Sequence, residues 1–248
     1  MTVEEREVVL SGKALNKSFG VGDCRFHILK NVDFELYSGE ILGIVGESGS
    51  GKSTLLKLIC GIERPDSGVL TYKGKEYTGM GPEKTGKFLQ MVFQDAYGSF
   101  DPKMTMEKSL REGSNASREE MIRITEEVGL SQDLLDRKPR LLSGGQCQRM
   151  SVARALLGHA DVLLCDEVTS ALDVTSQAQV VKMINEVREK EHISIMFVSH
   201  DLALVSNICD RVIVIKEGVV VDSGDTKEVI NNPKSDYTKR LLESVIEI

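Results

Sequence analysis

Residues 46–54 constrain the fold of this chain more than any other segment. They read Gly-Glu-Ser-Gly-Ser-Gly-Lys-Ser-Thr, follow the apolar run 41–45 and precede the largely apolar segment 55–60. The pattern predicts a buried strand, a glycine-rich turn and an amphipathic helix, in the spacing G-x-x-x-x-G-K-[ST] of a phosphate-binding loop. In such a loop, backbone N–H groups converge on phosphate oxygens, and the helix N-terminus adds a partial positive charge.

The residue types of this loop predict specific contacts with a nucleotide. Lys52 is expected to reach the β- and γ-phosphates, and the Ser53 hydroxyl is expected to bind Mg²⁺. The alternative is a glycine turn that only connects two elements. The expected nucleotide contacts within the loop are Gly46, Glu47, Ser48, Gly49, Ser50, Gly51, Lys52, Ser53 and Thr54.

The composition limits the class of protein. The 248 residues, 41% of them hydrophobic, suffice for one substantial core with an inserted subdomain. A net charge of −7, few aromatic residues and no Trp argue against a nucleic-acid partner. The polar, acid-rich first residues do not resemble a signal peptide, and no apolar run approaches the ~20 residues of a membrane span. We therefore expect a soluble protein, or one attached to a membrane only through a partner.

The five cysteines are scattered, and no pair forms C-x-x-C. Most of them lie within apolar runs. We expect buried, reduced thiols in a cytosolic protein.

Strands and helices alternate along most of the chain. Residues 8–10 and 26–36 predict antiparallel strands, whereas 88–93, 162–165, 194–198 and 212–215 predict buried strands. Helical spacing covers 106–157 and 174–190, and the stretch 73–86 is expected to be a loop. A hairpin is expected around Glu217–Gly218, followed by two short tail helices separated by Pro233. These patterns predict an α/β fold with a mostly parallel sheet and an inserted helical subdomain.

Polar residues stand just past three of the buried runs. Gln94, Asp166 and His200 occupy these positions, and parallel sheets bind ligands beyond the carboxyl ends of their strands. Asp166 is expected to supply a second Mg²⁺ contact, and Glu167 could accept a proton from an attacking water. Surface carboxylates at a strand end are the alternative.

A second glycine-rich helix start occurs at residues 142–146, Leu-Ser-Gly-Gly-Gln. Ser143 has N-cap chemistry, and the two glycines leave backbone N–H groups open. This pattern predicts a second anion site; an ordinary capped helix start is the alternative.

Taken in order, these motifs resemble the nucleotide-binding subunit of an ATP-binding cassette (ABC) transporter over nearly the whole chain. They correspond to the Walker A loop, the Q-loop residue Gln94, the signature 142–146, the Walker B residues Asp166 and Glu167, the D-loop 170–173 and the switch residue His200. The resemblance implies a P-loop NTPase of the ABC-ATPase type, with residues 1–248 as one nucleotide-binding domain. Its α/β core would comprise 1–94 and 161–248, including an N-terminal antiparallel subdomain, and 95–160 would form the helical signature subdomain.

The resemblance also implies ATP and Mg²⁺ as cofactors. Lys52, Gln94, Glu167 and His200 would be catalytic, and Ser53, Gln94 and Asp166 would hold the metal. Phe19 would lie against adenine, unless it is a core residue. In a head-to-tail pair of subunits, Ser143, Gly144, Gly145, Gln146 and Asp173 would close over the nucleotide held by the partner. The remaining histidines, His27, His159 and His192, are expected to be structural or exposed.

Residues 95–105 and 236–242 resemble the dipeptide, oligopeptide and nickel importer family. That resemblance implies a second ABC ATPase subunit, two transmembrane permeases and an extracytoplasmic binding protein as partners, at the cytoplasmic face of the membrane. The sequence lacks the longer cysteine-containing tail of many peptide-importing relatives, which favours the nickel or metallophore type over the peptide type.

Three other classes of protein are alternatives. A different ABC transport system remains an alternative. A soluble ABC ATPase acting on ribosomes or DNA is another, although such chains typically carry two cassettes, a coiled-coil insertion or zinc-binding cysteines. A simple P-loop kinase would lack the second glycine site at Ser143.

Overall fold

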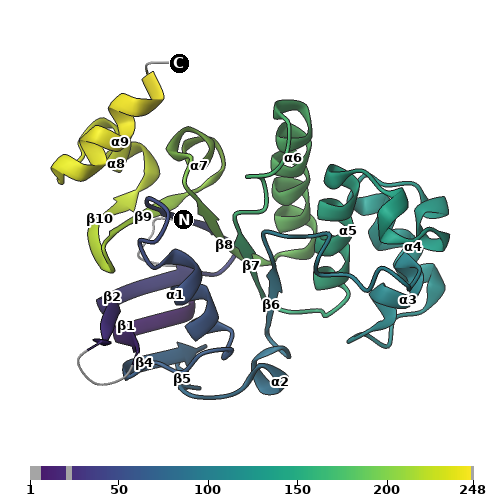
Figure 1. Cartoon of the computed structure of the whole chain (residues 1–248), viewed down its shortest axis with the longest axis horizontal. Helices are drawn as coiled ribbons and strands as arrows, with labels where there is room; N and C mark the ends of the chain where they lie inside the picture. The colour runs from purple at the N-terminus through teal and green to yellow at the C-terminus, as the bar shows by residue number, and fades with distance from the viewer. Residues whose placement is uncertain (1–6, 21–23, 247–248) are drawn as a thin grey trace. The chain divides into compact units, whose positions relative to one another are not determined.

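The computed structural model describes residues 7–20 and 24–246, which fold as two compact units (Figure 1). One unit contains the residues before Gly86 together with those after Ile193, and the other is Gly86–Ile193. The helical segment predicted for 95–160 lies wholly within the second unit. The predicted domain boundaries themselves remain a prediction.

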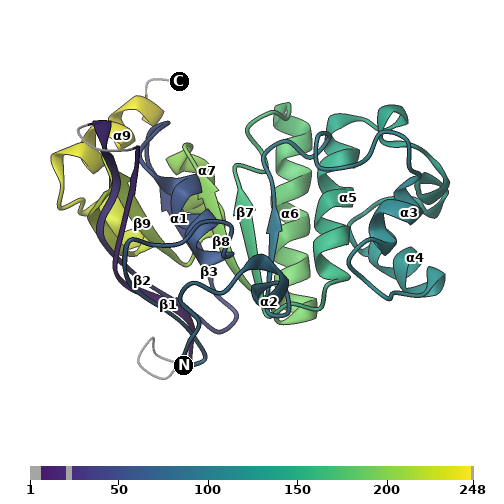
Figure 2. The same ribbon diagram turned by 60° about the horizontal axis from the view of Figure 1, so that its bottom comes forward.

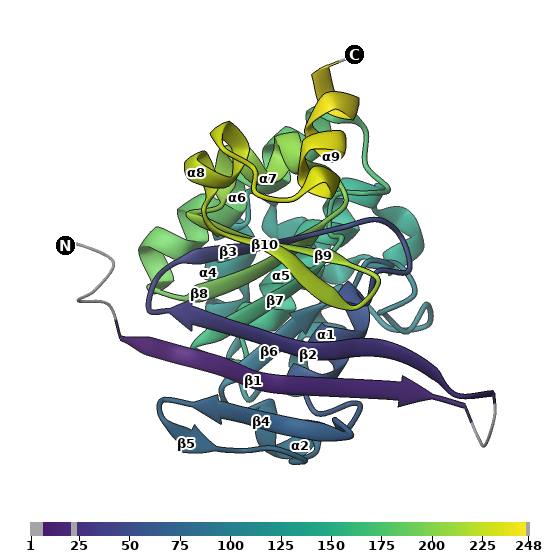
Figure 3. The same cartoon turned by 90° about the vertical axis from the view of Figure 1, so that its left-hand side faces the viewer.

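An antiparallel sheet of order β2-β1-β4-β5 belongs to the first unit (Figure 3). Its strands are β1 (Val8–Phe19), β2 (Phe26–Tyr37), β4 (Ser67–Tyr72) and β5 (Lys75–Glu76). The alternation expected in the second strand is confirmed, since Val32, Phe34 and Leu36 are buried. This sheet is the predicted N-terminal antiparallel subdomain.

Two sequence predictions for this region were wrong. The first strand was expected only at 8–10, but β1 continues to Phe19 because β2 and β4 pair with it on both sides. Those ladders satisfy the backbone hydrogen-bonding groups of β1. Its polar residues interrupt the apolar pattern, so the sequence alone did not predict the full strand. The stretch 73–86 is not all loop, since it contains β5 and the short helix α2 (Pro82–Thr85).

The first unit also contains four strands of a mostly parallel sheet, in the order β10-β9-β3-β8. Strand β3 (Ile41–Val45) runs parallel to β8 (Ser194–Ser199) and β9 (Arg211–Lys216), while β10 (Val219–Asp225) closes the predicted hairpin. Every residue of β3 and β8 is buried, as expected for strands covered on both faces. Helices α1 (Lys52–Ile59), α7 (Leu202–Ile208), α8 (Thr226–Asn231) and α9 (Asp236–Ile246) complete the unit.

The second unit pairs β6 (Leu89–Val92) with β7 (Val162–Asp166) in parallel and adds a group of helices. The helices are α3 (Met106–Arg111), α4 (Arg118–Glu127), α5 (Gly144–Leu156) and α6 (Val174–Glu191). Figure 2 shows α5 alongside α6, with α3 and α4 also packed against α5. The parallel pairs in both units and this helical insertion confirm the predicted α/β class.

The cysteine prediction holds for four of the five residues. Cys60, Cys147, Cys165 and Cys209 are buried, whereas Cys24 is exposed, and none forms a disulfide. Burial raises the pKa of Cys147 to about 11 and that of Cys165 to about 12, so both are thiols at neutral pH. Among residues 7–20 and 24–246, no helix has both the length and the apolar character required to cross a membrane.

Candidate nucleotide site

The phosphate loop joins β3 to α1 in the first unit and has a shape that only glycine permits at two positions. A Cβ on Gly46 would collide with the carbonyl oxygen of Ile215, and Gly51 has φ +108°. Between them, the Ser50 N–H donates to the Glu47 carbonyl at 3.2 Å and closes a turn. The loop therefore brings its backbone close to β9 before entering the helix.

Lys52 places a buried ammonium group inside this loop. Its side chain donates to the carbonyl oxygens of Gly46 at 2.7 Å and Glu47 at 2.9 Å, and the residue is only 4% exposed. The Ser50 hydroxyl is also buried and has no hydrogen-bond partner among the described residues. A buried cation, an unsatisfied hydroxyl and the N-terminus of α1 fit a phosphate group at this position.

Two further candidates lie in the first unit. His200 is exposed directly after β8, in a turn fixed by hydrogen bonds from the Asp201 N–H to the Ser199 hydroxyl and from the Leu204 N–H to the Asp201 carboxylate. Phe19 ends β1 with 40% of its surface exposed, so it is not a core residue. Lys17 Nζ lies 4.8 Å from its ring centroid, which leaves the ring as a surface platform.

In the second unit, the structure brings Gln94 and Glu167 together. The Gln94 amide donates to the Glu167 carboxylate at 3.2 Å and to the Ser170 hydroxyl at 3.2 Å. Glu167 has φ +47°, a backbone conformation that glutamate rarely adopts. Asp166, the last residue of β7, is only 7% exposed. Two carboxylates are therefore adjacent in the chain. Glu167 accepts a hydrogen bond from the Gln94 amide, and Asp166 is buried at the end of β7.

The signature segment begins α5 as a full capping box. The Gln146 N–H donates to Ser143 Oγ at 3.3 Å, and the Ser143 N–H donates to Gln146 Oε1 at 2.9 Å. The N-cap chemistry predicted for Ser143 is confirmed. The Gln146 side chain is engaged in the cap, while Ser143 and Gly144 remain exposed. Exposed backbone and hydroxyl groups at a helix start can accept an anion from outside the unit.

Asp173 caps α6 next to this helix start. Its carboxylate accepts hydrogen bonds from the N–H of Ser176 at 3.0 Å and from the hydroxyl of Ser176 at 2.8 Å, and these bonds lower the pKa of Asp173. A Cβ on Gly145 would lie 3.3 Å from the Ser176 side chain, so the beginnings of α5 and α6 are adjacent. The structure thus places the signature and the D-loop side by side.

Sequence reasoning missed three contacts around these residues. Ser170 was recognised only as part of the D-loop, yet its hydroxyl accepts from Gln94. Arg154 donates to the Ser99 carbonyl at 2.7 Å and to the Ser99 hydroxyl at 2.9 Å, with its guanidinium 4.3 Å from the Phe100 ring centroid. These contacts connect Ser99 and Phe100, in the segment after Gln94, to α5. The third contact joins Tyr237 to the phosphate loop. No local spacing pattern relates these partners.

The other histidines are exposed, as expected. His27, His159 and His192 are all on the surface. His159 Nε2 lies 3.1 Å from the Glu120 carboxylate. Among the residues that the structure describes, no group of three or more His, Cys, Asp and Glu side chains is placed to hold a metal ion.

Comparison with known proteins decides the family. The model of a family described as ABC transporter matches residues 29–170, which include the phosphate loop, Gln94, the signature and Glu167. The chain belongs to the ABC transporter family. This membership confirms the predicted fold type and the predicted enzyme class, an ATPase coupled to transport.

Relatives of this ABC protein match it over almost its full length. It is 40% identical to the oligopeptide transport ATP-binding protein OppF of Escherichia coli strain K12, over 98% of this chain and 79% of that protein. It is 36% identical to the dipeptide transport ATP-binding protein DppF of Haemophilus influenzae, with the same coverage.

Solved structures of ABC cassettes share the fold. A dimeric post-hydrolysis state of the cassette MJ0796 bound to ADP and Pi is 26% identical, covers 88% of this chain and 98% of that one, and has a TM-score of 0.78. The cbiO1 protein of Clostridium perfringens, part of the ABC transporter complex cbiONQ, is 28% identical over 98% of this chain and all of that one, with a TM-score of 0.81. Both likenesses agree with the family assignment.

Proposed function

We propose that this chain binds and hydrolyses ATP to power an importer of dipeptides or oligopeptides. The observation that carries the proposal is the phosphate loop, in which Lys52 Nζ is buried and held 2.7 Å and 2.9 Å from two loop carbonyls. A phosphate bound here exchanges those neutral acceptors for charged oxygens, a stronger interaction for an ammonium group. Phe19, exposed at the end of β1, offers the surface on which adenine stacks.

Mg²⁺ accompanies the nucleotide in this proposal and neutralises charge on the phosphates. The proposed ligands are the Ser53 hydroxyl, the Gln94 amide oxygen and the Asp166 carboxylate, all oxygen donors of the kind that Mg²⁺ prefers. Asp166 lies at the end of β7 and is only 7% exposed, so its carboxylate has little freedom to move.

Glu167 is the proposed general base. Its carboxylate accepts a hydrogen bond from Gln94, which orients it without supplying a proton. His200, exposed after β8, is proposed to contact the terminal phosphate and to orient the attacking water. Gln94 would then couple Mg²⁺ binding to the helices of the second unit.

Hydrolysis is proposed to require two subunits. Ser143 and Gly144 are exposed at the N-terminus of α5 and are therefore accessible to a partner subunit. In a head-to-tail pair, Ser143, Gly144, Gly145 and Asp173 would complete the nucleotide pocket of the partner. The MJ0796 cassette, a dimer bound to ADP and Pi, supports the pairing of two subunits. Nucleotide binding then favours the closed pair because it adds contacts that only the pair can make.

The proposed cargo and partners follow from the relatives. OppF and DppF are named for oligopeptide and dipeptide transport, so we propose a peptide importer with a second ATPase subunit, two transmembrane permeases and an extracytoplasmic binding protein. The chain would then sit peripherally on the cytoplasmic face of the membrane. The nickel or metallophore cargo favoured by the sequence stays a prediction, and these relatives do not support it.

Replacing Lys52 with alanine tests the site. We expect the Kd for ATP to rise at least about tenfold, because charge-assisted hydrogen bonds contribute roughly 1.5–3 kcal/mol. Lys57→Ala is the matched control, since Lys57 lies exposed on the same helix, and its Kd should stay within about twofold of wild type. Unchanged affinity in Lys52→Ala, measured by titration with a fluorescent ATP analogue, would refute the loop assignment.

The cargo is tested by uptake. A deletion strain complemented with the wild-type gene should regain uptake of a labelled dipeptide or oligopeptide, and the Lys52→Ala gene should not restore it. Restored uptake of labelled nickel without peptide uptake would instead support the nickel alternative.

A further inference from the structure

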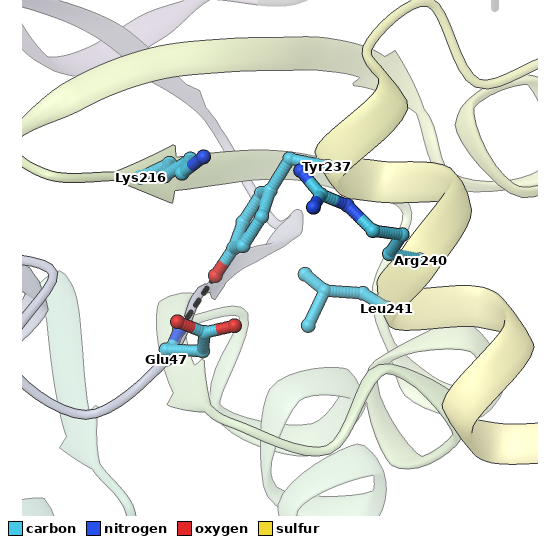
Figure 4. Close-up of a pocket in the computed structure, with 5 residues that line it drawn as sticks. All are labelled: Glu47, Lys216, Tyr237, Arg240 and Leu241. Atoms are coloured by element: carbon cyan, nitrogen blue, oxygen red, sulfur yellow. Dashed lines mark hydrogen bonds between the residues drawn. The ribbon is translucent and has the colours of Figure 1, made fainter.

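The phosphate loop is tied to the last helix of the chain through one side chain. The hydroxyl of Tyr237, on α9, accepts a hydrogen bond from the backbone N–H of Glu47 at 3.0 Å, as Figure 4 shows. Tyr237 is only 6% exposed, and burial raises its pKa, so the phenol is neutral at neutral pH. The bond joins residues 190 positions apart in the chain.

The backbone of Glu47 is therefore hydrogen-bonded on both sides of its Cα, through its N–H and through its carbonyl oxygen. Its carbonyl accepts from Lys52 Nζ at 2.9 Å and from the Ser50 N–H at 3.2 Å, and its N–H is taken by Tyr237. When Lys52 turns to a phosphate, one of these restraints is lost. Two hydrogen bonds from outside the loop do not depend on Lys52. They are the Tyr237 bond and the bond from the Gly218 N–H to the Ser50 carbonyl at 3.0 Å.

The hydrogen bond between Tyr237 and Glu47 lies beside a pocket in the first unit. A pocket of about 340 Å³ lies there, lined by Glu47, Lys216, Tyr237, Arg240 and Leu241 (Figure 4). Lys216 Nζ lies 5.2 Å from the Tyr237 ring centroid and helps to hold the ring in place. Without the hydroxyl, the Glu47 N–H loses its hydrogen-bond acceptor beside this pocket.

We propose that Tyr237 is a positioning residue that holds the phosphate loop in its nucleotide-binding shape, and that α9 thereby belongs to the nucleotide site. This inference rests on the proposed function, since it assumes that the loop binds ATP. A loop that already has its bound conformation spends less free energy on ordering when the nucleotide arrives. Movement of α9 would change nucleotide affinity by the same route.

The test replaces Tyr237 with phenylalanine in the full-length chain, which removes only the hydroxyl group that accepts from Glu47. We expect the Kd for ATP and for ADP to rise about three- to tenfold, the range expected for loss of one hydrogen bond. Tyr77→Phe is the matched control. Tyr77 is also a buried tyrosine of the same unit, and its hydroxyl donates to the Ile59 carbonyl at 3.2 Å, away from the phosphate loop.

Thermal unfolding of both variants separates positioning from stability. A merely structural role predicts that any change in nucleotide affinity follows the loss of Tm in both variants alike. Positioning predicts that only Tyr237→Phe loses affinity, even where Tyr77→Phe loses as much Tm. Equal affinity of Tyr237→Phe and wild type, or tighter binding, would overturn the inference while leaving the proposed function intact. Failure of the wild-type chain to bind ATP would overturn both.

Hydrogen exchange supplies a measurement that does not depend on the variant folding. In the wild-type chain without nucleotide, the Glu47 amide should exchange markedly more slowly than the Gly49 amide of the same exposed loop. Equally fast exchange at both amides would show that the Tyr237 bond is not maintained in solution, and the inference would fail.

Discussion

At the scale of single residues, the proposed chemistry depends on the orientation of a few carboxylates. Glu167 has φ +47°, and its carboxylate accepts a hydrogen bond from the Gln94 amide. Its backbone conformation and the orientation of its side chain are therefore both fixed. Asp166, its neighbour, is buried at the end of β7. If Asp166 holds the metal and Glu167 is the base, as proposed, the two functions can be lost independently.

Glu167→Gln should therefore still bind ATP but lose turnover. An amide cannot accept the proton of the attacking water, and loss of a general base typically costs at least about 100-fold in rate. ATP affinity should stay within about threefold of wild type, because Lys52, Ser53 and Asp166 are unchanged. Single-turnover hydrolysis and ATP titration check both expectations.

Glu126→Gln, an exposed carboxylate on α4, is the control and should leave both quantities unchanged. Near-normal turnover in Glu167→Gln would mean that another group accepts the proton.

At the scale of elements, several helices of the two units begin in the same way. Ser143, Ser117, Asp173 and Asp201 each accept a hydrogen bond from a backbone N–H in the first turn of α5, α4, α6 and α7. Capping alone therefore does not distinguish the signature helix. The distinguishing feature is the glycine pair after Ser143, of which Gly144 is exposed, where the partner's nucleotide is proposed to bind.

Ser143→Ala and Ser117→Ala form a matched pair that separates these contributions. Each should lower the free energy of unfolding by about 1 kcal/mol, the usual contribution of a side-chain cap, measured by urea denaturation. Only Ser143→Ala should also abolish ATP-dependent pairing, measured by light scattering in a Glu167→Gln background. Equal effects of the two variants on pairing would show that the Ser143 hydroxyl acts only as a cap.

At the scale of the whole molecule, the chain contributes half of each of two proposed pockets. The phosphate loop lies in the first unit, and the exposed signature segment lies at a helix start of the second. The structurally similar MJ0796 cassette is a dimer. In this proposal, catalysis requires an assembly of two subunits, although one chain carries every motif.

The specific ATPase activity of the isolated chain should therefore rise with protein concentration. If the active species is a weak dimer, activity per subunit is nearly proportional to concentration at low concentration, and it levels off once pairing is complete. Activity measured over a 100-fold concentration range at saturating ATP checks this dependence. A constant specific activity from a species that sedimentation shows to be monomeric would contradict it.

The sequence by itself determined the parts of this protein whose partners lie close along the chain. Two such parts are specified by residue type and spacing. They are the phosphate loop, in which Lys52 contacts carbonyls five and six residues away, and the capping box, whose partners are three positions apart. The buried strands β3, β7 and β8 could also be predicted, because continuous apolar runs leave few alternatives. Strand β1 could not, because its polar residues are stabilised by pairing on both sides.

Only the tertiary structure decided which distant residues meet. Gln94 contacts Glu167 across 73 positions, Arg154 contacts Ser99 across 55, and Tyr237 contacts Glu47 across 190. Periodicity reports which face of an element is buried, but not which other element covers it. No sequence pattern links a tyrosine in the tail to a glutamate in the loop. The bond between them uses a backbone N–H, which every residue except proline possesses. Packing of α9 beside the phosphate loop brings the two together.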